Sequence, residues 1–269
     1  MLFAAVSVML VYTSVGMVAA AFVARPPTGP GFWRLTILLV LVGLGLGVGL
    51  RLSALSTALP HPTVESLVAL GIASALLIGF GSRKAVDSNQ HHRWLLGVAT
   101  IAALASIALD PALRPTSGAS TLETIVHVAG LLSIASALGS VLLAMILAHW
   151  YLIEPRMPVA PLNRVLGMFL GTEGIKLILL FAIIAIHLPD WTGNGGGLLR
   201  AFVLGDALFV AVRATLGVLA PIALGWMTWK TVQIRSIQSA TGILYAAIVF
   251  VLFGEVISLY LSLSTGRPY

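Results

Sequence analysis

Cysteine is absent from all 269 residues of the sequence. Without thiolates the chain cannot build Cys-ligated zinc or iron–sulfur centres, attach a c-type haem covalently or use a catalytic thiol. Cysteine usage therefore carries no information about the redox compartment, but it removes four classes of site.

Charged residues are also scarce, at 9% of the chain, while 59% of the residues are hydrophobic. Soluble domains carry roughly a quarter charged residues, which cover their outer faces. Apolar runs in this sequence repeatedly reach the length of a membrane-spanning helix, roughly 17–25 residues. The composition therefore predicts an all-α integral membrane protein, surrounded by membrane lipids.

Motifs for independent enzymatic chemistry are missing as well. The sequence has no HExxH metal motif, no GxSxG nucleophile elbow and no paired acidic motif that would hold a diphosphate-bound metal. A more basic than acidic balance, with a net charge of +6, raises the question of nucleic acid binding. The basic residues are scattered between apolar segments rather than clustered on one face, so we expect no nucleic acid partner.

Pro, Gly and charge clusters divide the sequence into apolar segments. These segments predict a polytopic bundle of about eight transmembrane helices in a single transmembrane domain, 1–269. The first segment lacks the basic start of a cleavable signal, so we expect it to be a retained helix. The predicted segments are 1–24, 33–57, 64–82, 94–109, 122–151, 165–188, 198–228 and 237–263.

The orientation of these helices follows from the basic residues in alternate connectors, because positive charge is retained on the cytoplasmic side. One set of connectors holds nine Lys and Arg residues and the other set holds four. This asymmetry predicts both termini on the extracytoplasmic side, most naturally of a bacterial cytoplasmic membrane.

Ionisable residues divide the chain into an apolar packing half, 1–110, and a polar half, 111–269. In the first half Asp, Glu, Lys, Arg and His occur only at segment ends and in connectors, and the second segment carries Gly43, Gly45, Gly47 and Gly49. Glycines four residues apart let helix backbones approach closely in lipid, so we expect these to pack against another helix. Intramembrane charge is costly and usually marks a function, so we expect the chemistry in 111–269.

An inner cluster is predicted from the fifth and sixth segments, where His149, Glu173 and Lys176 lie toward the cytoplasmic side. Glu173 and Lys176 are three residues apart, which suits either a self-neutralising ion pair or a pair that relays protons or anchors a substrate. His149 is followed by Trp150, Tyr151 and a connector rich in proline. This stretch is a candidate wall for a quinone headgroup, a docking surface for another subunit, or an ordinary interfacial aromatic belt.

An outer cluster is predicted from three helices and contains His127, Asp206, Arg213 and Glu255. Asp206 and Arg213 are seven residues apart and thus lie on nearly one helix face. The alternatives are a buried structural network and a polar pathway. Pro221 would interrupt the same helix and free a backbone carbonyl.

The histidines are the candidate ligands for haem or a metal ion. A b-type haem needs two imidazoles at matched depth, and His127 with His187 is the pair that approaches this arrangement. His187 immediately precedes Leu188 and Pro189, so its depth matches poorly. The remaining histidines lack the spacing of a metal site, and we expect no metal.

Taken together, these features predict an integral membrane subunit of an electron-transfer or energy-transducing complex. Such a subunit would anchor partner subunits and contribute a quinone- or proton-handling site. The alternative is a secondary transporter or ion-coupled carrier with a polar pathway in residues 111–269. Either reading favours a non-catalytic membrane protein over an independent enzyme, with the substrate left open.

Overall fold

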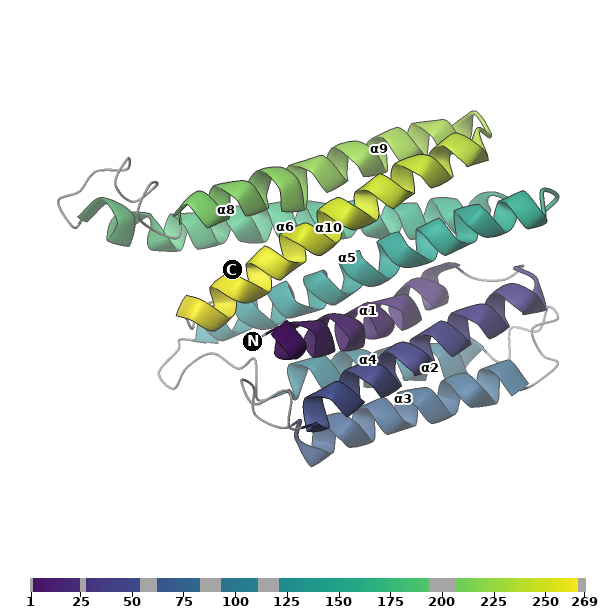
Figure 1. Cartoon of the computed structure of the whole chain (residues 1–269), viewed down its shortest axis with the longest axis horizontal. Helices are drawn as coiled ribbons and strands as arrows, with labels where there is room; N and C mark the ends of the chain where they lie inside the picture. The colour runs from purple at the N-terminus through teal and green to yellow at the C-terminus, as the bar shows by residue number, and fades with distance from the viewer. Residues whose placement is uncertain are drawn as a thin grey trace.

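The computed structural model describes residues 2–24, 28–53, 62–82, 93–110, 121–193 and 207–265. Within these ranges the chain is helical and contains no strand (Figure 1). The helices are α1 (Leu2–Ala24), α2 (Pro30–Leu52), α3 (Val64–Ser82), α4 (Arg93–Ala108), α5 (Thr121–Ile153), α6 (Ala160–Gly193), α8 (Ala207–Ala214), the π-helix η4 (Thr215–Leu219), α9 (Ala220–Gln233) and α10 (Ile237–Thr265). An all-α fold is thus confirmed.

Six helices are long and apolar enough to cross a membrane: α1, α2, α5, α6, the continuous α8–η4–α9 helix and α10. Two further apolar helices, α3 and α4, are shorter. Exposed side chains on these helices include large apolar ones such as Ile101, Ile178 and Val249, each more than 60% exposed. An apolar outer surface of this kind suits lipid as the surrounding solvent, so the multi-pass membrane character is supported.

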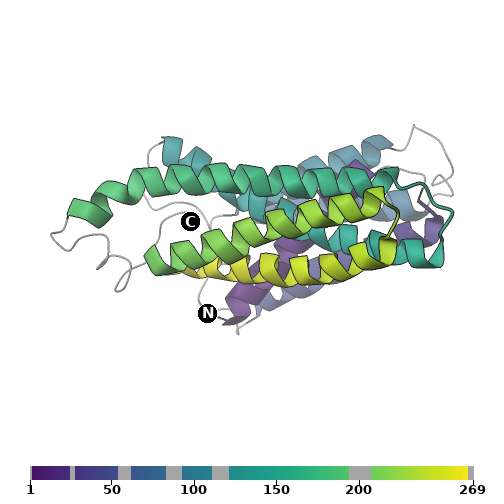
Figure 2. The ribbon, with the colours of Figure 1, turned by 90° about the horizontal axis from the view of Figure 1, so that it is seen from above.

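The helices form two groups that meet along α1 and α5 (Figures 1 and 2). On one side, α1 packs against α2 and α4, and α3 packs against α4; on the other, α5 packs against α6 and α10. The start of α1 and the end of α10 lie at the same end of the molecule. The α5–α6 and α9–α10 connectors lie at the opposite end, which we call the connector end.

Glycine allows α1 and α5 to cross with their backbones in contact. A Cβ atom added at Gly139 would lie 1.9 Å from the carbonyl carbon of Gly16, and one added at Gly16 would lie 1.7 Å from the carbonyl oxygen of Ala135. Without a strong hydrophobic force between helices in lipid, close backbone packing is a main source of helix association. The pair Gly16 and Gly139 therefore fixes the contact between the two groups of helices.

The four glycines of α2 at 43, 45, 47 and 49 differ in whether they contact α1. Added Cβ atoms at Gly43 and Gly47 would lie 2.2 Å from the Ser14 hydroxyl oxygen and 2.8 Å from a Val11 methyl carbon, both on α1. Those at Gly45 and Gly49 would meet nothing within 4 Å. The predicted packing role is confirmed for Gly43 and Gly47 and is wrong for Gly45 and Gly49, which lie on the opposite face of α2.

Candidate functional site: a buried ion cluster between α6, η4 and α10

Lys176 lies at the centre of an ion cluster formed by three helices, α6, α10 and the continuous α8–η4–α9 helix. Its Nζ atom is 3.1 Å from Oε1 of Glu173 on α6 and 2.5 Å from Oε1 of Glu255 on α10. The same ammonium donates a hydrogen bond of 3.1 Å to the carbonyl oxygen of Gly217 in η4. Arg213, on α8, interacts electrostatically with both glutamates. We call Glu173, Lys176, Arg213 and Glu255 the ion cluster.

All four side chains are buried. Glu173 and Glu255 are 0% exposed, Lys176 is 2% exposed and Arg213 is 5% exposed. Charged groups in such surroundings are costly unless they are paired, and here two carboxylates face two cations. The ion cluster is therefore neutral as a whole when all four groups are ionised.

A close approach of two backbones brings Glu255 to Lys176. A Cβ atom added at Gly254 would lie 2.2 Å from the Cα atom of Gly217, which only a pair of glycines permits. Because Glu255 directly follows Gly254, this contact carries its carboxylate toward η4 and α6. Glycine at 217 and 254 thus sets the geometry of the ion pair.

Proline explains why Gly217 offers its carbonyl to a side chain. In an α-helix that carbonyl would accept a hydrogen bond from the N–H of residue 221, but Pro221 has none. The helix is a π-helix over Thr215–Leu219, and the N–H of Ala220 bonds to the carbonyl of Thr215. Single π turns of this kind occur frequently at functional sites. Lys176 supplies the donor that the irregular helix lacks.

The structure unites residues that the sequence assigned to two depths. Lys176 lies about 24 Å along α6 from the connector end, and Glu255 lies about 27 Å along α10 from the same end, by the helix rise per residue. The two residues are therefore at similar depth. Glu255 was predicted in an outer cluster, apart from Glu173 and Lys176, and that separation is wrong. The error arose because α6 begins at Ala160 rather than near 165, which shifts its residues deeper. Arg213 and Glu255, predicted in one cluster, interact electrostatically, but the ion pair of Glu255 is with Lys176.

The other predicted site residues either lie apart from one another or fall outside the residues that the structure describes. His149 is exposed, and Trp150 packs against Phe32 with ring centroids 6.3 Å apart, so neither joins Glu173 and Lys176. His127 is buried on α5 at 7% exposure. Asp206 lies outside the described residues, as does the side chain of His187, so the haem pair stays untested.

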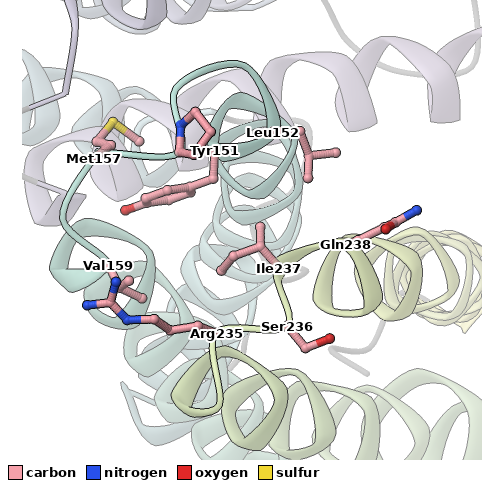
Figure 3. Close-up of a pocket in the computed structure, with 9 residues that line it drawn as sticks. Tyr151, Leu152, Met157, Val159, Arg235, Ser236, Ile237 and Gln238 are labelled. Carbon is pink, nitrogen blue, oxygen red and sulfur yellow. The ribbon is translucent and has the colours of Figure 1, made fainter.

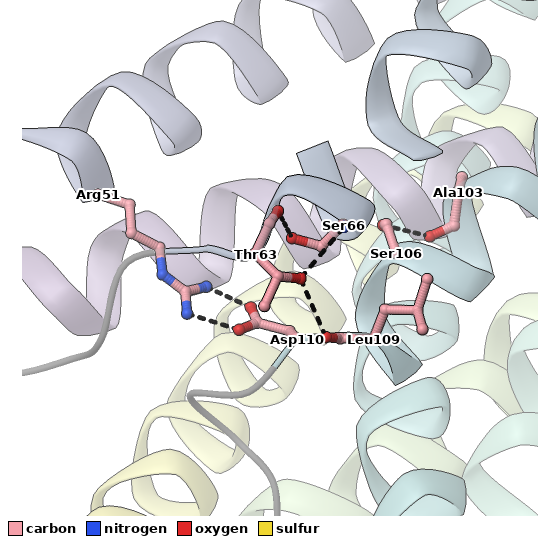
Figure 4. A network of polar contacts seen from close by, with 7 residues as sticks. All are labelled: Arg51, Thr63, Ser66, Ala103, Ser106, Leu109 and Asp110. Carbon is pink, nitrogen blue, oxygen red and sulfur yellow. Dashed lines mark hydrogen bonds and ion pairs between the residues drawn. The ribbon is translucent and has the colours of Figure 1, made fainter. Parts of the chain in front are cut away.

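A second buried ion pair, which the sequence did not reveal, lies in the apolar half. Arg51 at the end of α2 donates through both terminal nitrogens to Asp110, which follows α4, with Nη2 2.7 Å from Oδ1 (Figure 4). Thr63 donates to the carbonyl of Leu109 in the same region. Arg51 is 3% exposed and Asp110 is 7% exposed. Arg51 is one of the four basic residues on the less positive set of connectors, and no local pattern points to its partner 59 positions away.

Replacing Asp110 with Asn should lower the free energy of unfolding by about 1.5–3 kcal/mol, the usual cost of losing hydrogen bonds to a charged group. The substitution keeps the shape of the side chain but removes the negative charge that the bidentate arginine pairs with. Chemical denaturation in detergent, followed by circular dichroism, measures the change. An unfolding free energy equal to that of the unmodified protein would show that the pair contributes nothing to stability.

No protein-family model, curated protein or solved structure matches this chain. The functional conclusion therefore depends on the geometry of the sites alone.

Proposed function

We propose that the chain is a membrane subunit of an electron-transfer or energy-transducing complex, and that its ion cluster handles protons. In this proposal eight helices span a bacterial cytoplasmic membrane with both termini outside. The positions of Arg156 and Arg235 support that orientation, because both belong to connectors at the connector end. Positive residues are retained on the cytoplasmic side, which would be this end.

Two carboxylate oxygens carry the proposal. Oε2 of Glu173 and Oε2 of Glu255 are buried and have no hydrogen-bond partner among the described residues. A buried polar atom without a partner is rare and calls for an explanation such as a catalytic role. An oxygen of this kind, beside Lys176, is a place where a proton can bind and be released.

The charge balance of the ion cluster suits coupling to electron transfer. A proton bound by either glutamate gives the cluster one net positive charge, and interactions between charges are strong away from water. A negative charge arriving on a nearby redox group would therefore favour proton uptake, and its departure would favour release. A permanent ion pair of purely structural role would show no such response.

One observation favours the second candidate, an ion-coupled carrier. The helix that supplies Gly217 changes from α to π geometry over η4 and carries Pro221 beside the ion cluster, and irregular helices recur at functional sites, transporter binding sites among them. In this case Arg213 and Glu255 would line the polar pathway. A flux assay in proteoliposomes decides between the two, since a carrier needs no companion subunit to support flux.

The test uses Glu255→Gln in the native membrane, purified in mild detergent by a tag on the chain. We expect companion subunits or a redox cofactor to purify with the unmodified protein and with the variant. Proton-coupled turnover of that complex should fall at least tenfold in the variant, because glutamine cannot exchange a proton. Glu65→Gln, at an exposed position in the first turn of α3, is the matched control and should leave turnover unchanged.

Two results would contradict the proposal. If the native protein migrates alone, without companion subunits, haem or quinone, it is not part of such a complex. If the complex purifies intact and Glu255→Gln retains full coupled turnover, the ion cluster is structural.

A further inference from the structure

A cavity at the connector end is separate from the ion cluster. Its volume is about 490 Å³, which is within the range of small-molecule sites. The cavity is formed where the α5–α6 connector faces the short α9–α10 turn (Figure 3). Its walls combine apolar side chains, chiefly Leu152, Met157, Val159 and Ile237, with the polar Ser236 and Gln238 and with Arg235.

Arg235 is the charged residue among those that line the cavity. Figure 3 shows its side chain extending from the α9–α10 turn toward Val159 on the opposite connector. Ser236 adds a hydroxyl, which donates a hydrogen bond of 3.1 Å to the hydroxyl of Ser239, and Gln238 adds an amide donor. Charge and donors together suit an anion that carries several oxygen atoms, such as a phosphate group.

The backbone at Arg235 is strained, independently of the cavity. Its φ angle is 56°, in the left-handed region that favours glycine. The N–H groups of Arg235 and Ser236 bond to the carbonyls of Val232 and Thr231, which is the Schellman pattern at the end of α9. Glycine is the usual residue at this position, so arginine is present at a cost to stability. Residues held in such conformations cluster at binding and active sites.

Tyr151 does not supply a free donor to the cavity. Its hydroxyl donates to the carbonyl of Pro158, which fixes the ring as part of the wall. His149 and Trp150, predicted beside it for a quinone headgroup, are not among the lining residues. The lining offers any ligand the donors of Arg235 and Gln238, and the positive charge of Arg235 favours an anion over a neutral quinone.

We propose that this cavity binds the phosphate headgroup of an anionic phospholipid, with Arg235 as its charged ligand. Of the apolar lining residues, Leu152 belongs to α5 and Ile237 to α10, so the acyl chains of such a lipid would follow the outside of these two helices. Basic pockets between membrane helices on the cytoplasmic side are established sites for anionic headgroups. The orientation proposed above puts this cavity on that side, but the lipid site requires neither electron transfer nor proton transfer.

The experiment measures the thermal unfolding of purified protein in dodecylmaltoside, with phosphatidylglycerol or phosphatidylcholine added. Phosphatidylglycerol should raise the Tm of the unmodified protein by about 5 °C, because a ligand of the folded state stabilises it. Phosphatidylcholine, which has no net charge, should raise it far less. Arg235→Gly should abolish the difference between the two lipids while keeping or raising the Tm without lipid, because glycine relieves the strained backbone.

Arg156→Gln is the matched control, since it removes one positive charge from the α5–α6 connector without being a lining residue. The control should keep the response to phosphatidylglycerol. Equal responses in Arg235→Gly and in the unmodified protein would overturn the site. So would an equal shift with inorganic phosphate, which would assign a free anion, or an Arg235-dependent shift with a short-chain quinone alone.

Discussion

Lys176→Met should destabilise the protein by about 3–5 kcal/mol, the cost typical of removing one partner from a buried charge pair. Methionine fills much of the same space but leaves Glu173 and Glu255, both 0% exposed, facing one another with Arg213 as their remaining cation. The carbonyl of Gly217 also loses its donor. Denaturation in detergent, monitored by circular dichroism, should show the loss, with a reduced yield of monodisperse protein.

The double variant Glu173→Gln/Lys176→Met should recover most of that loss. It removes one negative and one positive charge, so Glu255 and Arg213 remain as a balanced pair. Comparing the two single variants with the double variant gives the coupling between the residues directly. A double variant as unstable as the sum of the singles would show that the charges do not compensate each other.

Gly139→Val should disrupt the contact between α1 and α5. Overpacking of a well-packed core costs typically 1–3 kcal/mol, and more when the neighbour cannot move. Here the neighbour is backbone, since a Cβ atom at Gly139 would lie 2.1 Å from the amide nitrogen of Met17 and closer still to Gly16. We expect at least 3 kcal/mol of destabilisation, roughly the upper end of that range, measured by the same denaturation assay.

Gly130→Ala is the control on the same helix. A Cβ atom at Gly130 meets nothing within 4 Å, so the substitution adds no clash. Its stability should equal or slightly exceed that of the unmodified protein because alanine is the better helix former. If Gly139→Val behaves like Gly130→Ala, the close α1–α5 contact does not hold the two groups of helices together.

Helix positions could be predicted from the sequence because apolar runs and breakers are local signals. The segment predicted at 64–82 coincides with α3, and the others begin and end within several residues wherever they are described. The largest discrepancy concerns α6, which was expected to begin near residue 165 because the prolines at 155, 158 and 161 are typical of a connector. Pro161 instead lies in the first turn of α6, where a missing N–H costs nothing.

Which side chains meet could be predicted only in part. The three-residue spacing of Glu173 and Lys176 on one helix predicts that they lie side by side, and the structure shows them as an ion pair. The choice between a structural pair and a functional one stays a prediction. The contact between Lys176 and Glu255 depends on helix register and on the glycines at 217 and 254, which no local pattern encodes. For the same reason the bond between Arg51 and Asp110 escaped prediction, although both residue types are unusual in apolar surroundings.

Infrared difference spectroscopy of the native purified complex, recorded between its oxidised and reduced states, tests the central proposal most directly. A glutamate that gains or loses a proton changes the carboxylic acid stretching band. We predict such a change in the unmodified complex, its loss or shift in Glu255→Gln or Glu173→Gln, and its retention in Glu65→Gln. A spectrum without any carboxylic acid change, or one that is identical in all three variants, would contradict a proton-handling role for the ion cluster.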